Sequence, residues 1–195
     1  EEDYFNNEIP FYEETGVGTP ITFSQADNGI SQIIDLPFSF EYFCDPVTQV
    51  RLSTNGYLLL NTAAFSFGNN QTMPVSIVPN SIVALMWDDL VDSTGQSSFF
   101  TTGIAPNRKF VVNVDLVHKG GTVNTERVKG QTILHESTNI IDVICETCQQ
   151  DADDGTATQG IENTSGMIGV TTSGRNNGAW SAINNAQRFF PQSSL

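Results

Sequence analysis

The sequence predicts an all-β protein, an antiparallel and jelly-roll-like β-sandwich of about ten strands. Short runs of Val, Ile, Thr and Phe recur along the 195 residues, and such runs are typical of strands. The 16 Gly and eight Pro are spread along the chain, which indicates turns and no long linker in its middle. No segment favours a long helix, and only a short helical turn is expected, near 184–188.

Two parts are expected along the chain. Residues 1–20 mix Pro, Gly and acidic side chains with aromatic ones, and predict an extended arm or linker without regular structure. Residues 21–195 predict a single β-sandwich domain, because all-β domains of this length commonly do not divide. The strands expected in this part are Ile33–Phe43, Val47–Ser53, Tyr57–Leu60, Ile82–Leu90, Ser97–Thr101, Lys109–Val117, Arg127–His135, Ile140–Cys145, Ala157–Ile161 and Met167–Thr171.

Two segments show the two-residue period of a half-buried strand. In 38–43 and in 110–117, alternate residues are strongly apolar, so one face of each strand is expected in the core. Between the strands Val47–Ser53 and Tyr57–Leu60, the pair Asn55-Gly56 predicts a tight hairpin. We expect a type I′ turn there, which requires a positive φ at both central residues.

The charge of the chain excludes several classes of partner. Its 22 acidic and eight basic residues give a formal net charge of −14, which phosphate backbones and anionic lipid headgroups would repel. No nucleic acid is therefore expected as a partner. No run of about 18 apolar residues occurs, so no membrane insertion is expected either. The acidic start Glu1-Glu2-Asp3 is unlike the basic start of a signal peptide, and we expect a signal to be missing from this sequence.

The first candidate site follows a strongly apolar strand, Ile82–Leu90. This strand ends in Trp87 and two adjacent carboxylates, Asp88 and Asp89, and its apolar character indicates a central position. Because successive side chains of a strand point to opposite faces, Asp88 and Asp89 can face one ligand only where the strand bends. Either these carboxylates accept hydrogen bonds from loop amides, or they contribute to a cation or ligand site at the rim of the sandwich.

A second acidic segment, 151–155, resembles a calcium loop, because alternate carboxylates followed by Gly can surround a cation. It lacks the Glu that completes an EF-hand loop, and a solvated acidic turn is the alternative. We predict Ca²⁺ as the candidate cofactor, held by loops of one rim. The candidate metal ligands are Asp88, Asp89, Asp151, Asp153 and Asp154.

The three cysteines, Cys44, Cys145 and Cys148, are interpreted as the partners of a structural disulfide. The bridge would form either within the pair Cys145–Cys148 or from Cys44 to one member of that pair. Zinc binding would require more ligands, and redox catalysis would favour the N-terminus of a helix in a βαβ unit, which the sequence lacks. One disulfide and one remaining thiol are therefore expected.

No pattern of catalytic residues is recognisable, and no enzymatic activity is predicted. His118 and His135 are expected at the surface or the rim, and His135-Glu136 lacks the second His of a zinc-protease motif. Trp180 is the candidate ligand-binding residue, because an exposed aromatic ring can stack against a sugar. Packing in the core is the alternative for this side chain.

An ordered series of segments resembles a β-sandwich module of secreted bacterial multidomain proteins and, more distantly, the nidogen-type extracellular domain. The resemblance covers roughly 33–191 and implies an extracellular setting without a shared catalytic activity. Cys44, the Cys-x-x-Cys at 145–148 and the segment 149–154 depart from the usual pattern. The segments that carry the resemblance are Leu36–Phe40, Leu52–Leu58, Pro79–Leu90, Ala105–Val112, Gly160–Asn163 and Arg188–Pro191.

These observations predict a secreted or cell-surface protein module that adheres to or recognises a ligand and does not catalyse a reaction. The expected partners are a surface glycan or protein and the flanking domains of the same polypeptide. Two alternatives are a carbohydrate-binding module attached to a secreted enzyme and a structural subunit of an extracellular fibre.

Overall fold

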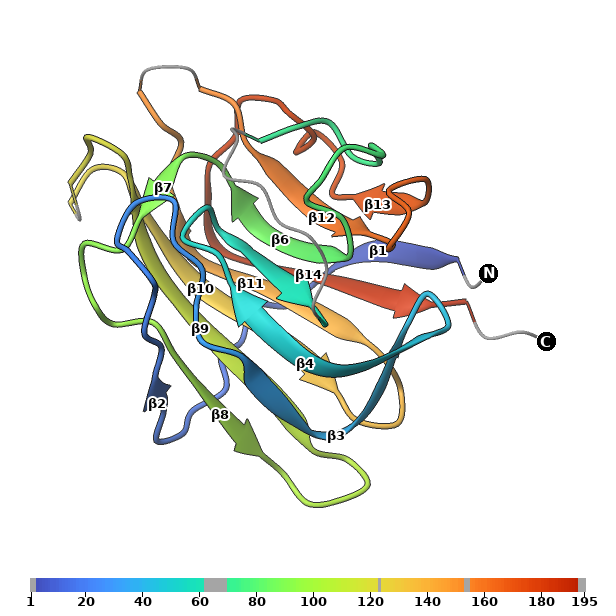
Figure 1. Ribbon diagram of the computed structural model, residues 1–195. Coiled ribbons are helices and arrows are strands. Elements are labelled where there is room, and N and C mark those ends of the chain that lie inside the picture. Colours follow the sequence, from blue (N-terminus) through green and yellow to red (C-terminus); the bar gives the residue numbers. More distant parts are fainter. Residues whose placement is uncertain (1–2, 62–69, 123, 153–154, 193–195) are drawn as a thin grey trace.

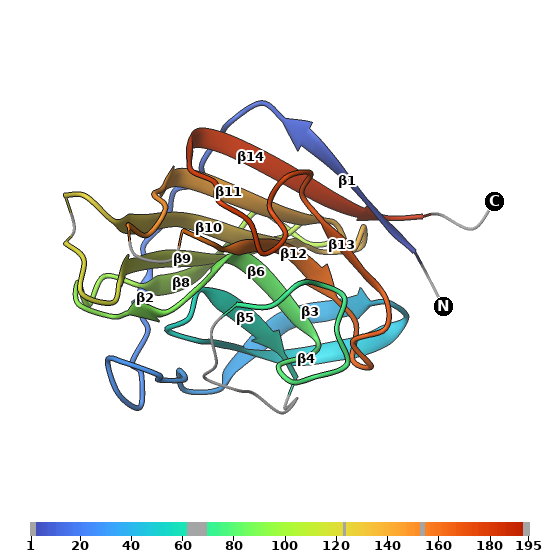
Figure 2. The same cartoon turned by 90° about the horizontal axis from the view of Figure 1, so that it is seen from above.

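Two antiparallel sheets packed face to face form the protein, so the predicted β-sandwich is confirmed (Figures 1 and 2). The computed structural model describes residues 3–61, 70–122, 124–152 and 155–192, which contain fourteen strands. The eight-stranded sheet has the order β1 (Tyr4–Ile9), β14 (Ala182–Pro191), β11 (Ile141–Cys148), β10 (Arg127–His135), β9 (Lys109–His118), β8 (Ser98–Thr102) and β2 (Thr19–Pro20), and β7 (Leu90–Val91) pairs with β9. The six-stranded sheet has the order β13 (Gly169–Thr171), β12 (Thr158–Glu162), β6 (Ile82–Trp87), β5 (Tyr57–Leu60), β4 (Asp45–Leu52) and β3 (Ile34–Tyr42).

The main core lies between the two sheets and receives alternate residues from the strands that line it. Val112, Val114 and Leu116 of β9 belong to one buried cluster with Val83 and Leu85 of β6. The two-residue period that the sequence shows is therefore the period of burial, and the intervening residues of β9 point to the outer face of the eight-stranded sheet.

Strand β6 is central, as its apolar sequence predicts. It lies between β12 and β5, and all six of its residues are buried. Val83 and Leu85 face the main core, whereas Ile82, Ala84 and Trp87 form a second buried cluster with residues of β5 and with Met73. A strand that is buried on both faces has no solvent-facing positions, so its sequence shows no alternation.

The hairpin between β4 and β5 is confirmed, but the expected type I′ turn is wrong. Gly56 has a φ of +78°, whereas Asn55 is not among the residues with positive φ. The Gly56 amide donates to the Ser53 oxygen at 3.1 Å, and the Ser53 amide donates to the Tyr57 oxygen at 2.9 Å. The connection is therefore one residue longer than a two-residue loop, and only its last residue is left-handed.

The two ends of the chain form strands that the sequence analysis did not predict. In β1 and β14, Tyr4 lies opposite Pro191, so the ends of the chain lie side by side (Figure 1). The helical turn expected near 184–188 is wrong, because this segment belongs to β14 and pairs with both β1 and β11. The expectation that 1–20 lacks regular structure is also wrong, since this segment contains β1 and β2.

In the part of the chain that the structure describes, no helix has the length and apolar character needed to cross a membrane.

Candidate functional site

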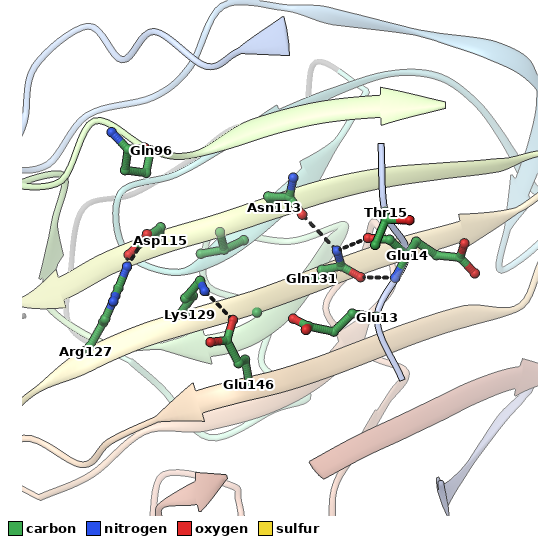
Figure 3. Close-up of a pocket in the computed structure, with 12 residues that line it drawn as sticks. Glu13, Glu14, Thr15, Gln96, Asn113, Asp115, Arg127, Lys129, Gln131 and Glu146 are labelled. Carbon is green, nitrogen blue, oxygen red and sulfur yellow. Dashed lines mark hydrogen bonds and ion pairs between the residues drawn. The ribbon is translucent and has the colours of Figure 1, made fainter. Parts of the chain in front are cut away.

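A polar groove with a volume of about 430 Å³ crosses the outer face of the eight-stranded sheet (Figure 3). Because alternate residues of β9 face the core, Asn113 and Asp115 point outward. On β10, Gln131 lies opposite Asn113 and Lys129 lies opposite Asp115. The floor of the groove is therefore made of polar side chains that regular pairing places in two facing rows.

A β-bulge adds another carboxylate to the groove. The pairing of β10 with β11 shifts, so that Lys129 lies opposite Thr147 while Gly130 lies opposite Cys145. Glu146 is the extra residue, and its carboxylate lies 2.5 Å from Lys129 Nζ. A Cβ atom at Gly130 would lie 1.9 Å from a backbone oxygen of β11, so only glycine fits at this position.

An arm of the chain, residues 10–18, leads from β1 toward β2 and forms one wall of the groove (Figure 3). The Glu14 amide donates to Gln131 Oε1 at 2.9 Å, and Gln131 Nε2 donates to the Glu14 backbone oxygen at 2.8 Å. Lys109 Nζ donates to Glu14 Oε1 at 2.6 Å. These contacts fix the arm across the strands and keep the side chain of Glu13 at the edge of the groove.

A buried carboxylate holds the arm farther along the sheet. Asp142 is fully buried and accepts hydrogen bonds from Arg188 Nε at 2.7 Å, from His135 Nε2 at 2.7 Å and from the Tyr12 hydroxyl. Burial alone would raise the pKa of Asp142, but the hydrogen bonds from Arg188, His135 and Tyr12 hold it well below its ordinary range. The arm is thus anchored through a charged network that the sandwich buries.

The groove carries both signs of charge. Arg127 donates to both carboxylate oxygens of Asp115, at 2.9 and 2.6 Å, and Lys129 pairs with Glu146. Burial raises the pKa of the Glu13 carboxyl, and the negative charge of Glu146 raises it further. Donors and acceptors therefore lie next to one another across the surface. Such a surface suits a ligand with many hydroxyl groups and does not favour a polyanion.

The structure also brings two of the predicted rim carboxylates together. One ligand atom each from Asp88, Asp151 and His118 lie within 4.8 Å of one another. His118 was expected at the surface or the rim; it ends β9 at the rim and is buried there, with 1% of the residue exposed. Asp89 is not part of this group, and its Oδ2 lies 3.8 Å from Lys119 Nζ. The two adjacent carboxylates, which lie in the bend between β6 and β7, therefore face different partners.

Two other predicted ligands, Asp153 and Asp154, lie outside the described residues. The sequence analysis missed His118 because its partners, Asp88 and Asp151, lie far from it along the chain. It also missed the groove. The alternation in β9 was a signal that Asn113 and Asp115 point outward, whereas no local pattern marked Glu146 or the arm as parts of the same surface.

Trp180 packs in the sandwich, and its ring is not available to stack on a sugar. The side chain is 8% exposed, and Nε1 donates to the Ala157 oxygen at 3.0 Å. The guanidinium of Arg175 lies over the ring, 4.7 Å from its centroid. The expectation that Trp180 binds a ligand is therefore corrected, because the indole N–H and a face of the ring contact groups of the chain itself.

The three cysteines are free thiols, so the expected disulfide is not present in the structure. Cys44 lies in the exposed turn between β3 and β4, whereas Cys145 and Cys148 are buried on β11. Gln159 Nε2 donates to Cys145 Sγ at 3.3 Å. Burial, and then the hydrogen bond to Cys145, raises the pKa of the Cys148 thiol well above its ordinary value, which disfavours the reactive thiolate.

Comparison with known proteins identified a family that the chain matches. The model of a family described as NIDO related matches residues 4–193. The matched residues include both sheets, the groove and the group Asp88, His118 and Asp151. No curated protein and no solved structure matches the chain.

Proposed function

Since the chain belongs to the NIDO-related family, we propose that it is an extracellular recognition module without enzymatic activity, and that it binds its ligand in the polar groove. The family indicates an extracellular type of module. The secreted or cell-surface location, the adhesive role and the ligand are our proposals.

The groove is the observation that carries the proposed function. Its volume of about 430 Å³ falls in the range of small-ligand sites, roughly 300–1,000 Å³. Its floor stands on three neighbouring strands, and the arm that forms its wall is hydrogen-bonded to Gln131 and Lys109. Supports of this kind keep a surface ordered before a ligand arrives, which reduces the entropy lost on binding.

A glycan is the ligand class that the groove fits best. The pairs Arg127–Asp115 and Lys129–Glu146 offer charged donors beside charged acceptors, and Gln96 and Asn113 add amides. Sugar hydroxyls both donate and accept hydrogen bonds, so an uncharged sugar can bind to such alternating donors and acceptors. A protein ligand that presents polar side chains is the alternative, and it is an outcome of the experiment below.

Flanking domains of the same polypeptide would leave the groove accessible. The ends of the chain lie together at the β1–β14 edge, where Tyr4 faces Pro191. The groove instead lies over β9, β10 and β11, which are farther across the sheet.

The first experiment is a glycan array with the purified chain, followed by calorimetry with a glycan that it retains. Glu146→Gln keeps the shape of the side chain and removes its charge, and the association constant should fall about tenfold, because hydrogen bonds to charged groups contribute about 1.5–3 kcal/mol. Glu8→Gln on the exposed edge of β1 is the matched control and should bind as the wild type does.

Two outcomes would contradict the proposal. If no glycan binds while a protein ligand does, the glycan assignment is wrong. If Glu146→Gln binds a retained glycan as tightly as the wild type, the groove is not the binding surface. Incubation with a retained glycan should release no product, and chromatographic detection of cleavage would show that the module is an enzyme.

A further inference from the structure

The rim of the sandwich next to the end of β6 gathers three side chains that commonly bind metal ions. Asp88 directly follows β6, His118 ends β9, and Asp151 follows β11. Their ligand atoms lie within 4.8 Å of one another, and Asp88 and His118 are each 1% exposed. Zinc binds nitrogen and oxygen ligands at about 2.0–2.2 Å, so two ligand atoms of one ion lie at most about 4.4 Å apart, and a small rotation of these side chains would let one ion contact all three.

The orientation of the His118 ring is the decisive detail. Its Nε2 lies 2.7 Å from the backbone oxygen of Gln149. A carbonyl oxygen only accepts, so Nε2 carries the hydrogen. In the neutral ring, Nδ1 then presents its lone pair, and this atom lies 3.4 Å from Asp88 Oδ2. Two acceptor atoms face each other at a buried position, and a cation between them, either a metal ion or a proton, relieves their repulsion.

The hydrogen bond from His118 to the Gln149 oxygen is also of the kind that metal-binding histidines usually make with the nitrogen that does not bind the metal. A histidine that binds a metal through one nitrogen almost always donates from the other to a carbonyl or a carboxylate, which fixes the tautomer and the ring. The nearby ammonium group of Lys119 is directed to other carboxylates. Its Nζ lies 2.9 Å from Asp27 Oδ2 and 3.8 Å from Asp89 Oδ2.

A buried amide lies on the turn that holds Asp88. The backbone oxygen of Asn55 accepts from the Asp88 amide at 3.2 Å. The residue is 0% exposed, and neither its Oδ1 nor its Nδ2 has a hydrogen-bond partner within the described part of the chain. A buried polar group without a partner destabilises the fold. The side chain of Asn55 is thus a buried amide beside this rim that the rest of the described chain does not satisfy.

We infer that Asp88, His118 and Asp151 bind a single divalent transition-metal ion, such as zinc. An imidazole nitrogen beside two carboxylates suits zinc and its neighbours, whereas calcium takes six to eight oxygen ligands. A divalent ion also balances the charge of the two carboxylates. The inference does not depend on the groove, and it replaces calcium with a transition metal at the rim that the sequence analysis singled out.

The test uses the whole chain, treated with EDTA and then titrated separately with ZnCl₂ and CaCl₂ by calorimetry. Zinc should bind with one equivalent per chain and raise the melting temperature, and calcium should bind at least about tenfold more weakly. Asp151→Asn should weaken zinc binding about tenfold or more, as loss of a supporting contact already costs 10–100-fold. Asp89→Asn, next to Asp88 and outside the group, is the matched control and should bind zinc as the wild type does.

Nitrogen-15 NMR of the histidine rings separates the metal from a proton and does not require a variant. On addition of zinc, the His118 Nδ1 resonance should shift to the range of a metal-bound nitrogen while Nε2 keeps its hydrogen. A doubly protonated ring that zinc leaves unchanged would overturn the inference, since the site would then be an ion pair. Tighter binding of calcium than zinc, or unchanged zinc affinity in Asp151→Asn, would also overturn it.

Discussion

Replacement of Glu162 by Gln is expected to remove a pH dependence from the stability of the protein. Glu162 ends β12, and its side chain is 0% exposed. Oε2 accepts from the Val75 amide at 2.7 Å, and the Asn80 amide nitrogen, turned toward Oε1, donates to it at 3.2 Å. Burial raises the pKa of Glu162 from an ordinary 4.5 to about 7, because the backbone hydrogen bond from Val75 offsets only part of the desolvation.

The sign of the effect follows from proton binding. Between pH 4.5 and about 7 the native carboxyl keeps its proton while the unfolded one loses it, so stability falls as the pH rises. The contribution of the protonated group is complete below pH 4.5 and is lost as the pH rises through about 7. Each pKa step corresponds to about 1.4 kcal/mol, so the wild type should lose about 2.5 kcal/mol relative to Glu162→Gln between pH 5 and pH 8.

The assay is urea unfolding of both proteins at pH 5 and at pH 8, followed by tryptophan fluorescence. Gln has the same shape and still accepts from the Val75 amide, so the variant should fold. Glu41→Gln, at an exposed position of β3, is the control and should follow the wild type at both pH values. An equal difference in unfolding free energy between the wild type and Glu162→Gln at pH 5 and pH 8 would refute the reasoning.

Two substitutions and one labelling experiment test the arm, the core and the thiols. Tyr12→Phe removes a hydroxyl that donates to the buried carboxylate of Asp142, and should destabilise the fold by about 1.5–3 kcal/mol. Amide hydrogen exchange in 10–18 should also become faster. Unchanged exchange would show that this hydrogen bond does not hold the arm. Trp180→Ala should cost about 3–5 kcal/mol in urea unfolding because the ring is 8% exposed, and a loss of ligand binding without a loss of stability would contradict this role. Ellman's reagent should label Cys44 in the native protein and also Cys145 and Cys148 after unfolding, whereas a count of one thiol after unfolding would reveal a disulfide.

Much of the fold could be predicted because burial repeats locally along a strand. The predicted bounds of β5 and β10 agree with the structure, and those of β9 differ by one residue. The strands β1, β2 and β14 were not predicted, although β14 lies inside the eight-stranded sheet between β1 and β11. β1 and β14 pair across the two ends of the chain, and this pairing leaves no local signal in either segment.

In the candidate sites, too, local features could be predicted and contacts between distant segments could not. The end of a buried strand marked Asp88, and an acidic segment marked Asp151, because both features are visible within a few residues. His118 could not be identified as their neighbour, since the pairing of strands decides which ends meet at one rim. The groove depends further on the bulge at Glu146 and on the path of the arm, and both result from contacts between distant segments.

The sequence by itself determined the class of the fold, the central place of β6, the acidic charge and the candidate metal ligands Asp88 and Asp151. These features can be read from composition and from patterns within a few consecutive residues. Only the tertiary structure decided that Trp180 is buried, that the cysteines are free thiols and that Asp88, Asp151 and His118 converge. The physical reason is that these outcomes depend on strand order and on the packing of the two sheets. Both are set by the balance of many long-range contacts across the whole chain.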